Sequence, residues 1–334
     1  MPFHAYAASS PGGAFQPFDF DPGPLGPNEV EIDVAYCGLC HSDLSMLRNE
    51  FGVTAYPFVP GHEAAGTVAA VGGAVSTHQV GQKVGLGWFS RSCMHCKPCM
   101  SGDHNLCTTV QSTIIGRHGA FANKVRCSAE WARPLPDSLD MATAGPLFCG
   151  GITVFNPIVQ MGVLPTSRVG VIGIGGLGHM ALQFLNKWGC EVIAFTSSAS
   201  KQEEALRLGA HRTVNSRSEQ ELAGIAESLD FILSTVAADV DWGSYLGALA
   251  PRGRLHFVGV PPSPVTFPVT SILFKQRAIS STPLGSPQTT STMLEFCARH
   301  GIAPVVEEFA MSDVNEAFAH LEAGKARYRI VLKN

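Results

Sequence analysis

The sequence predicts an α/β protein of two domains, one rich in β-strands and one built on a doubly wound parallel sheet. The chain has 334 residues, which is more than one hydrophobic core usually supports. Short apolar strands separated by glycines dominate the part before residue 150. Beyond that point strand-like and helix-like segments alternate, which is typical of a parallel sheet.

The first domain begins with a clear strand pattern. Residues 28–35 alternate polar and apolar side chains, as a half-buried strand does. Residues 67–71 and 83–86 are further apolar segments, bounded by glycines that favour turns. These segments predict a β-rich domain.

The second domain shows the alternating pattern most clearly. We expect strands at 168–172, 191–195, 230–234 and 254–258, and helices at 177–188 and 201–208. Two further helices, 292–300 and 313–323, and a last strand at 329–332 return the chain to the first domain. The expected domains are therefore 1–149 with 288–334, and 150–287.

Composition narrows the class of protein. Hydrophobic residues make up 45% of the chain and charged residues 15%, with a formal net charge of −4. This balance predicts a compact globular protein and argues against nucleic acid or an anionic membrane as a partner. Residues 1–10 show no signal peptide, and no apolar run is long enough for a spanning helix. We expect a cytoplasmic protein with reduced thiols.

Four of the ten cysteines are closely spaced. Cys93, Cys96, Cys99 and Cys107 form the pattern C-x2-C-x2-C-x7-C. Four thiolates in one short loop suit a closed, tetrahedral, structural zinc site. An iron–sulfur cluster is the main alternative.

A second group of possible metal ligands is spread over three segments. Cys40 lies in Cys-Gly-Leu-Cys-His-Ser-Asp, His62 and Glu63 in Gly-His-Glu, and Cys149 in Pro-Leu-Phe-Cys-Gly-Gly. Singly, His62 is better explained as a core histidine and Cys149 as a buried thiol. Together they would offer zinc three ligands and one open position, as a catalytic site requires.

The remaining cysteines have a simpler explanation. Cys37 forms C-x2-C with Cys40, a spacing also found in redox pairs. Because Cys40 is assigned to the metal, we interpret Cys37 as a buried strand thiol. Cys127, Cys190 and Cys297 receive the same interpretation.

A glycine-rich loop follows the first strand of the second domain. Gly173, Gly175, Gly176, Leu177 and Gly178 belong to the pattern G-x-G-x-x-G between a strand and a helix. In this context the glycines allow a tight turn and the close approach of a pyrophosphate to the helix N-terminus. The loop predicts a dinucleotide site.

The end of the next strand distinguishes NAD from NADP. An acidic residue there would bind the ribose hydroxyls of NAD and repel a 2′-phosphate. The chain instead has Thr196, Ser197, Ser198 and Lys201, and no carboxylate. This predicts NADP(H), since hydroxyls and a lysine can hold a phosphate. The alternative is that the serines only cap the following helix, which is compatible with NAD.

Taken in order, these motifs resemble the zinc-containing medium-chain alcohol dehydrogenases from about residue 25 onward. Ser-Ser before a lysine and Pro-Leu-Gly-Ser at 283–286 resemble the cinnamyl alcohol dehydrogenase branch. Residues 36–46, 87–93 and 324–329 resemble the bacterial NADPH-dependent broad-specificity aldehyde reductases of that branch. The resemblance implies a GroES-like catalytic domain, a Rossmann cofactor domain and two zinc ions per chain.

The resemblance also implies roles for individual residues. Cys40, His62 and Cys149 would bind catalytic zinc, with Glu63 an occasional ligand and Asp43 orienting His62. Ser42 would hydrogen-bond the substrate oxygen and start proton transfer, and His41 would contact the cofactor pyrophosphate. The expected cofactor site further includes Thr153, Thr235, Val236, Val258, Gly259, Thr282 and Leu284.

Two parts of the expected site are less defined. Many relatives carry a histidine three residues after the serine, as the outer end of a proton relay, and this chain has Ser45 there. The proton must then leave through water, a ribose hydroxyl or Ser45 itself. Phe51 and Trp88 are the best candidates for an apolar substrate pocket.

These expectations favour one reaction, to which three alternative functions remain. Zinc would act as a Lewis acid while a hydride passes between NADP(H) and an aldehyde or primary alcohol. A polyol or sugar dehydrogenase, a zinc-free quinone reductase and a catalytically inactive relative are the alternatives. We expect a homodimer, with an apolar edge strand at 266–269 or at 272–274 as its interface.

Overall fold

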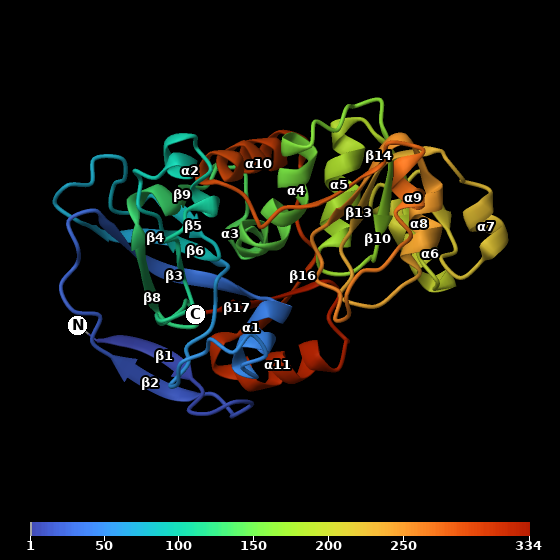
Figure 1. Ribbon diagram of the computed structural model, residues 1–334. Coiled ribbons are helices and arrows are strands. Elements are labelled where there is room, and N and C mark those ends of the chain that lie inside the picture. The colour runs from blue at the N-terminus through green and yellow to red at the C-terminus, as the bar shows by residue number, and fades with distance from the viewer. Residues whose placement is uncertain (1) are drawn as a thin grey trace. The chain divides into compact units, whose positions relative to one another are not determined.

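The computed structural model describes residues 2–334 and divides the chain into two compact units (Figure 1). Unit 1 contains Met1–Ile152 and Gly285–Asn334, and unit 2 contains Thr153–Leu284. The chain passes between the units after Ile152 and after Leu284, and each boundary lies three residues from the expected one. Unit 2 is thus inserted into the sequence of unit 1.

A seven-stranded sheet forms the centre of unit 1, in the order β16-β17-β3-β4-β5-β9 with β8 also paired to β3. Its strands are β3 (Glu29–Leu39), β4 (Ala64–Val71), β5 (Lys83–Leu86), β8 (Lys124–Ser128), β9 (Arg133–Pro134), β16 (Val306–Ala310) and β17 (Arg329–Lys333). Along one edge of β3, β8 pairs with residues 29–33 and β17 with residues 36–39. This second pairing makes β3 longer than the sequence pattern predicts.

Smaller elements surround this sheet. The remaining strands form two two-stranded sheets, β1 (Phe3–Ala7) with β2 (Gln16–Phe20) and β6 (Phe89–Arg91) with β7 (Gln111–Ser112). The α-helices are α1 (His41–Leu47), α2 (Lys97–Met100), α3 (Met141–Ala144), α10 (Pro287–His300) and α11 (Val314–Glu322). The 3-10 helices are η1 (His104–Leu106), η2 (Ala129–Trp131), η3 (Gly145–Phe148) and η4 (Met311–Asp313). Val30, Ile32 and Val34 of β3 belong to the hydrophobic core of unit 1.

Unit 2 is built on a six-stranded parallel sheet in the order β12-β11-β10-β13-β14-β15. Its strands are β10 (Arg168–Ile172), β11 (Glu191–Phe195), β12 (Arg212–Val214), β13 (Leu229–Ser234), β14 (Leu249–Phe257) and β15 (Ala278–Ser281). Its helices are α4 (Gly150–Gln160, which starts in unit 1), α5 (Gly178–Trp188), α6 (Ala199–Arg207), α7 (Glu219–Ala223), α8 (Trp242–Ala248) and α9 (Thr270–Leu273).

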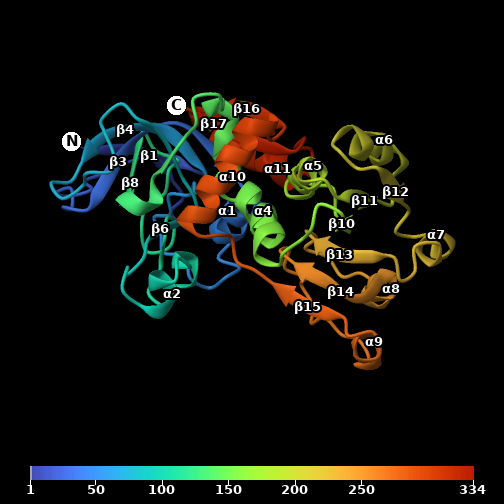
Figure 2. The same ribbon diagram turned by 90° about the horizontal axis from the view of Figure 1, so that it is seen from above.

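This strand order is that of a doubly wound dinucleotide-binding fold. In Figure 2, α5 and α6 lie on one side of the sheet and α8 on the other. The order reverses between β10 and β13, which is where such folds bind their ligands. The predicted fold class is therefore confirmed.

The predicted apolar edge strand of unit 2 is wrong. Residues 266–269 form no strand, most of 272–274 belongs to α9, and the edge of the sheet is β15. Pro264 and Pro268 explain the difference, because proline has no N–H to donate to a ladder. The side chains of this segment are nevertheless exposed, Phe274 to 77%.

Among the described residues, no single helix is long and apolar enough to span a membrane. The bent pair Met141–Phe148 and Gly150–Gln160 meets the criteria of length and composition when taken together. Most residues of both segments are buried within the protein.

Candidate active site and metal centres

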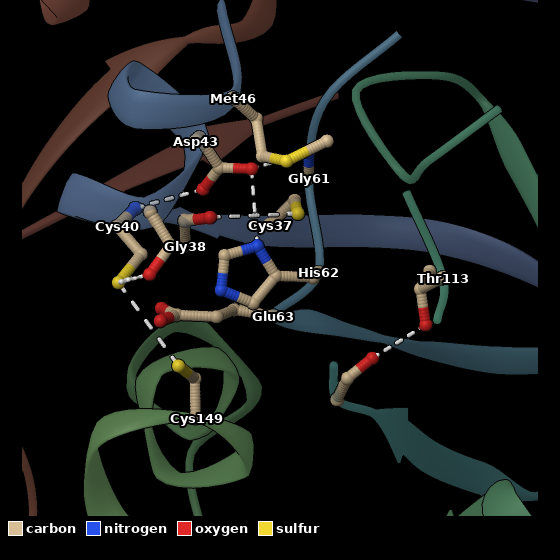
Figure 3. Close-up of polar contacts among 12 residues, drawn as sticks. Cys37, Gly38, Cys40, Asp43, Met46, Gly61, His62, Glu63, Thr113 and Cys149 are labelled. Atoms are coloured by element: carbon tan, nitrogen blue, oxygen red, sulfur yellow. Dashed lines mark hydrogen bonds and ion pairs between the residues drawn. The ribbon is translucent and has the colours of Figure 1, made fainter. Parts of the chain in front are cut away.

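Three segments far apart in the sequence bring Cys40, His62, Glu63 and Cys149 together in unit 1 (Figure 3). Cys40 precedes α1, His62 and Glu63 precede β4, and Cys149 lies between η3 and α4. Their ligand atoms all lie within 4.8 Å of one another. None of the four is more than 9% exposed. We call this group the Cys40 cluster.

The donor atoms of the Cys40 cluster fit a zinc ion. Cys40 Sγ and Cys149 Sγ are 4.0 Å apart, close to the separation of about 3.8 Å for two thiolates on one tetrahedral ion. His62 Nε2 is buried and has no hydrogen-bond partner among the described residues. A buried unpaired nitrogen is costly, and metal coordination would remove that cost.

Asp43 orients the imidazole of His62. Its Oδ1 accepts hydrogen bonds from His62 Nδ1 at 3.0 Å and from the Gly61 N–H at 2.9 Å. Its Oδ2 accepts the Cys40 N–H at 3.0 Å. With Nδ1 carrying the proton, the lone pair of Nε2 is free for a metal. The Asp43 carboxylate thus links the segment that carries Cys40 to the segment that carries His62.

Arg329 is a member of this site that the sequence analysis missed. It begins β17, is 5% exposed, and its Nη2 donates to Glu63 Oε1 while Nη1 lies 3.8 Å from Cys40 Sγ. A Cβ at Gly38 would overlap the other carboxylate oxygen of Glu63. The only sequence signal for Arg329 was its place in the motif 324–329.

Charges within the Cys40 cluster shift the pKa values of its thiols. The hydrogen bond between the two sulfurs lowers the pKa of Cys40 well below 9.0, assisted by the Arg329 cation and opposed by burial. The same bond and burial raise the pKa of Cys149. Burial opposes protonation of His62, but Asp43 and Cys40 together raise its pKa well above 6.5. The lowered pKa favours the thiolate form of Cys40, which is the form that binds a metal cation.

The first turn of α1 carries the predicted proton-transfer residues. Ser42 Oγ lies 3.8 Å from Cys40 Sγ, at the edge of the cluster. His41 is exposed, and Ser45, one turn further along, is buried. The roles of His41 and Ser42 stay predictions.

The two predicted pocket residues have different surroundings. The Trp88 ring meets the His62 ring edge-on, with centroids 4.8 Å apart and an angle of 81°. Phe51 is 54% exposed on the turn after α1, and no contact described for residues 2–334 joins it to the cluster. Trp88 thus lies against His62, one of the proposed zinc ligands, whereas Phe51 does not.

The four-cysteine lobe is formed within residues 93–107. The Sγ atoms of Cys93, Cys96, Cys99 and Cys107 all lie within 4.8 Å of one another, with Cys93 and Cys99 at 3.9 Å. This spacing fits one tetrahedral ion, whereas an iron–sulfur cluster distributes its four thiolates over two or four iron atoms and so holds them further apart. Backbone N–H groups donate to two of the sulfurs, Cys96 to Cys93 and Cys93 to Cys107.

The other four cysteines agree with their simple interpretation. Cys37, Cys127, Cys190 and Cys297 are buried, and all ten cysteines are free thiols. Cys37 lies in β3 and donates to the Gly38 carbonyl at 3.6 Å. Burial raises its pKa. It is a strand thiol, separate from the ligand set.

The glycine loop of unit 2 connects β10 to α5. Gly173 has φ +87°, and a Cβ at Gly178 would overlap the Gly173 carbonyl oxygen. In contrast, a Cβ at Gly175 would meet nothing within 4 Å. The loop backbone therefore packs tightly between Gly173 and Gly178, but the space beside Gly175 is free. A pyrophosphate site at a helix N-terminus requires such free space.

Other predicted cofactor residues gather at the same edge of this sheet. Thr235 follows β13, and its hydroxyl donates to the carbonyls of Ile172 and Gly173 at 2.9 and 2.8 Å. A Cβ at Gly259 would overlap the Val236 carbonyl oxygen. The predicted cofactor residues that follow the carboxyl ends of β13, β14 and β15 are Thr235, Val236, Val258, Gly259, Thr282 and Leu284. Thr153 lies on α4, and its role stays a prediction.

The segment after β11 contains the residues expected at a 2′-phosphate. The buried Thr196 accepts the Ser198 N–H at 3.2 Å, while Ser197 is exposed. Ser198 is the N-cap of α6, but its hydroxyl makes no capping bond and instead lies 2.9 Å from that of Ser200. The capping alternative therefore receives no support from the hydrogen bonding. Lys201 is half-buried in the first turn of α6.

The fold and the two clusters define a zinc-binding dehydrogenase, and comparison with known proteins agrees. The family described as "Alcohol dehydrogenase GroES-like domain" matches residues 26–137. The family described as "Zinc-binding dehydrogenase" matches residues 176–299. The chain belongs to the zinc-containing medium-chain alcohol dehydrogenases.

Individual relatives cover nearly the whole chain. It is 55% identical over 330 residues to aldehyde reductase AdhA of Synechocystis sp., covering 99% of this chain and 98% of that protein. A cinnamyl alcohol dehydrogenase of Sorghum bicolor has a TM-score of 0.95 and 34% identity, covering 100% and 98%. The Helicobacter pylori CAD complexed with NADP(H) has a TM-score of 0.90 and 31% identity, covering 100% and 99%.

Proposed function

We propose that the protein is a zinc-dependent aldehyde reductase that uses NADPH to reduce aliphatic and aromatic aldehydes, and oxidises the primary alcohols in reverse. The Cys40 cluster carries this proposal. Cys40, His62 and Cys149 supply three ligands, which leave the fourth tetrahedral position of a zinc ion open to a substrate oxygen. The four-cysteine lobe has no such position and would hold a structural ion.

The surrounding residues have distinct tasks in this reaction. Zinc would supply Lewis acidity at the substrate oxygen, and NADPH would supply the hydride. Asp43 keeps His62 in the tautomer that presents Nε2. Arg329 pairs with Oε1 of Glu63, while Oε2 has no partner among the described residues and would serve as an occasional ligand. Trp88 forms an apolar wall beside His62.

Proton transfer would begin at Ser42. Its hydroxyl, 3.8 Å from Cys40 Sγ, donates to the reduced substrate oxygen and is then reprotonated. The exposed His41 contacts the cofactor pyrophosphate. Because Ser45 replaces the usual histidine, the proton reaches solvent through water, a cofactor ribose hydroxyl or Ser45.

The preference for NADP(H) rests on the segment after β11. Ser197, Ser198 and Lys201 offer hydroxyls and a cation, and no carboxylate follows β11 before Glu203. A 2′-phosphate therefore meets attraction and no repulsion. The Helicobacter pylori relative described with NADP(H) supports the same choice.

Initial rates would test this function. One aliphatic and one aromatic aldehyde are assayed with NADPH and with NADH, on protein of measured zinc content. We expect NADPH to be preferred on both, and Ser198→Asp to reverse the preference by placing a carboxylate at the 2′-phosphate. A preference for NADH in the wild type would overturn the cofactor assignment. No rate with either, in zinc-loaded protein, would favour a polyol dehydrogenase or an inactive relative.

We also propose that the protein is a cytoplasmic homodimer. Ten cysteines with no disulfide among them suit a reducing compartment. Val269, Leu273 and Phe274 are at least 60% exposed on unit 2, and clustered exposed apolar side chains favour association. Sedimentation of the wild type and of Phe274→Ser would test the dimer, and a monomeric wild type would contradict it.

A further inference from the structure

The segment Thr282–Leu284 connects β15 to the end of unit 2. Leu284 has φ +45°, in the left-handed region that favours glycine. A leucine keeps such a conformation only where its surroundings impose it. Two buried polar side chains of unit 2 reach this segment from different elements.

Asn156 holds one end of the segment. It lies on α4, is fully buried, and its Nδ2 donates to the Leu284 carbonyl at 2.5 Å. Its Oδ1 has no partner among the described residues. Turning the amide over would place Oδ1 against the Leu284 carbonyl oxygen, so the amide orientation follows from the contact. The bond to Leu284 is thus the one polar contact described for this side chain.

His256 holds the other end. It lies on β14 and is fully buried, with Nε2 3.1 Å from Thr282 Oγ1 and Nδ1 2.9 Å from Ser280 Oγ. Its ring stacks on Phe231 with centroids 5.7 Å apart. Burial lowers the pKa of His256 to about 4, so the ring is neutral near pH 7. A neutral ring has one N–H and one lone pair, so it donates to one of these two hydroxyls and accepts from the other.

We infer that Asn156 and His256 are positioning residues, which hold Thr282–Leu284 in the conformation that receives the nicotinamide end of the cofactor. The segment lies at the carboxyl end of β15, the edge of the sheet where ligands bind in this fold. The adenosine end is expected on the other side of the glycine loop, beside β11. The inference rests on the proposed function, because it requires unit 2 to bind the dinucleotide.

Binding of NADPH and of a fragment of it separates positioning from folding. Asn156→Leu keeps the side-chain size but leaves the Leu284 carbonyl without its donor. We expect the Kd for NADPH, from fluorescence titration of zinc-loaded protein, to rise about tenfold. The Kd for adenosine 2′,5′-bisphosphate, which lacks the nicotinamide end, should not change.

Asn186→Leu is the matched control. Asn186 Nδ2 also donates to a backbone carbonyl, that of Gly209 at 2.9 Å, but near the C-terminal end of α5. It should change neither Kd. His256→Phe keeps the stacked ring, removes both nitrogens, and should repeat the result of Asn156→Leu. It decides the question if Asn156→Leu does not fold.

The remaining outcomes overturn either the inference or the proposed function on which it rests. If NADPH binds the Asn156 and His256 variants as tightly as the wild type, the two residues do not position the segment. If both ligands are weakened equally, the residues only stabilise unit 2. Failure of the wild type to bind either ligand would instead refute the proposed function, so the two failures are distinguishable.

Discussion

The four-cysteine lobe takes all its ligands from residues 93–107, whereas the Cys40 cluster collects ligands from residues 40–149 and a charged partner from residue 329. In the lobe, backbone N–H groups donate to two of the four sulfurs, and all four belong to one short segment. In the Cys40 cluster, Asp43 and Arg329 are buried charges from separate elements. The lobe can therefore form locally, but the Cys40 cluster depends on the complete fold of unit 1.

Loss of one ligand should affect catalysis very differently in the two clusters. Cys40→Ser should lower kcat more than about 1,000-fold, since a Lewis acid lowers the barrier by several kcal/mol. Cys99→Ser should lower zinc content and thermal stability but keep kcat per folded molecule within about threefold. Steady-state rates with metal analysis would measure both. An active, zinc-depleted Cys40→Ser enzyme would refute the catalytic assignment, and Cys37→Ala is the control thiol.

Removing Arg329 tests whether the charges of the Cys40 cluster depend on each other. Arg329→Leu should lower the free energy of unfolding by about 3–5 kcal/mol, because the buried Glu63 carboxylate loses its partner. Glu63→Leu together with Arg329→Leu should recover most of this loss. Urea unfolding of both variants measures the coupling. Glu63→Leu alone completes the cycle, and a double variant destabilised by the sum of the two single variants would show that the two charges act independently.

Asp43→Asn tests whether the Asp43 carboxylate strengthens zinc binding by orienting His62. The variant keeps all metal ligands but removes the charge that fixes the imidazole tautomer. We expect zinc affinity at the Cys40 cluster to fall about 10–100-fold. Competition with a chromophoric chelator measures this affinity, and zinc in the four-cysteine lobe serves as the internal control. Unchanged affinity would mean that the carboxylate contributes only to folding.

Thr109→Val is the corresponding change in the lobe and should have the smallest effect. Thr109 Oγ1 lies 3.5 Å from Cys107 Sγ, and sulfur is a weak hydrogen-bond acceptor. Zinc affinity of the lobe should fall by only about twofold to threefold. The same chelator competition measures it. A loss as large as that of Asp43→Asn would contradict the contrast between the two clusters.

Elements with local signals could be predicted from the sequence. The bounds of β10 and β11 match the expected 168–172 and 191–195, because buried parallel strands are short apolar runs and the glycine loop separates them from a helix. The extension of β3 to Leu39 could not be predicted, since it pairs there with β17 from the other end of the chain. The prediction of an edge strand at 266–269 was wrong, because it gave the apolar residues of this segment more weight than its proline.

The candidate site shows the same division. The lobe and the metal ligands carry recognisable spacings and motifs, and both groups come together as ligand clusters. Asn156 and His256 carry no such signal, and Arg329 has only its place in the motif 324–329, because each has its main partner elsewhere in the sequence. A basic residue at the start of a strand usually faces solvent, so only the folded chain identifies Arg329 as buried.

The insertion of unit 2 into the sequence of unit 1 sets an order of events during synthesis. Cys40, His62 and Cys149 leave the ribosome before all of Thr153–Leu284, and Arg329 leaves after it. A nascent chain thus exposes its metal-binding thiols for the time needed to translate unit 2, without β17 beside β3. At about 5–20 residues per second, this interval lasts several seconds or more. Zinc supply and oxidant levels in that interval decide whether those thiols meet zinc first.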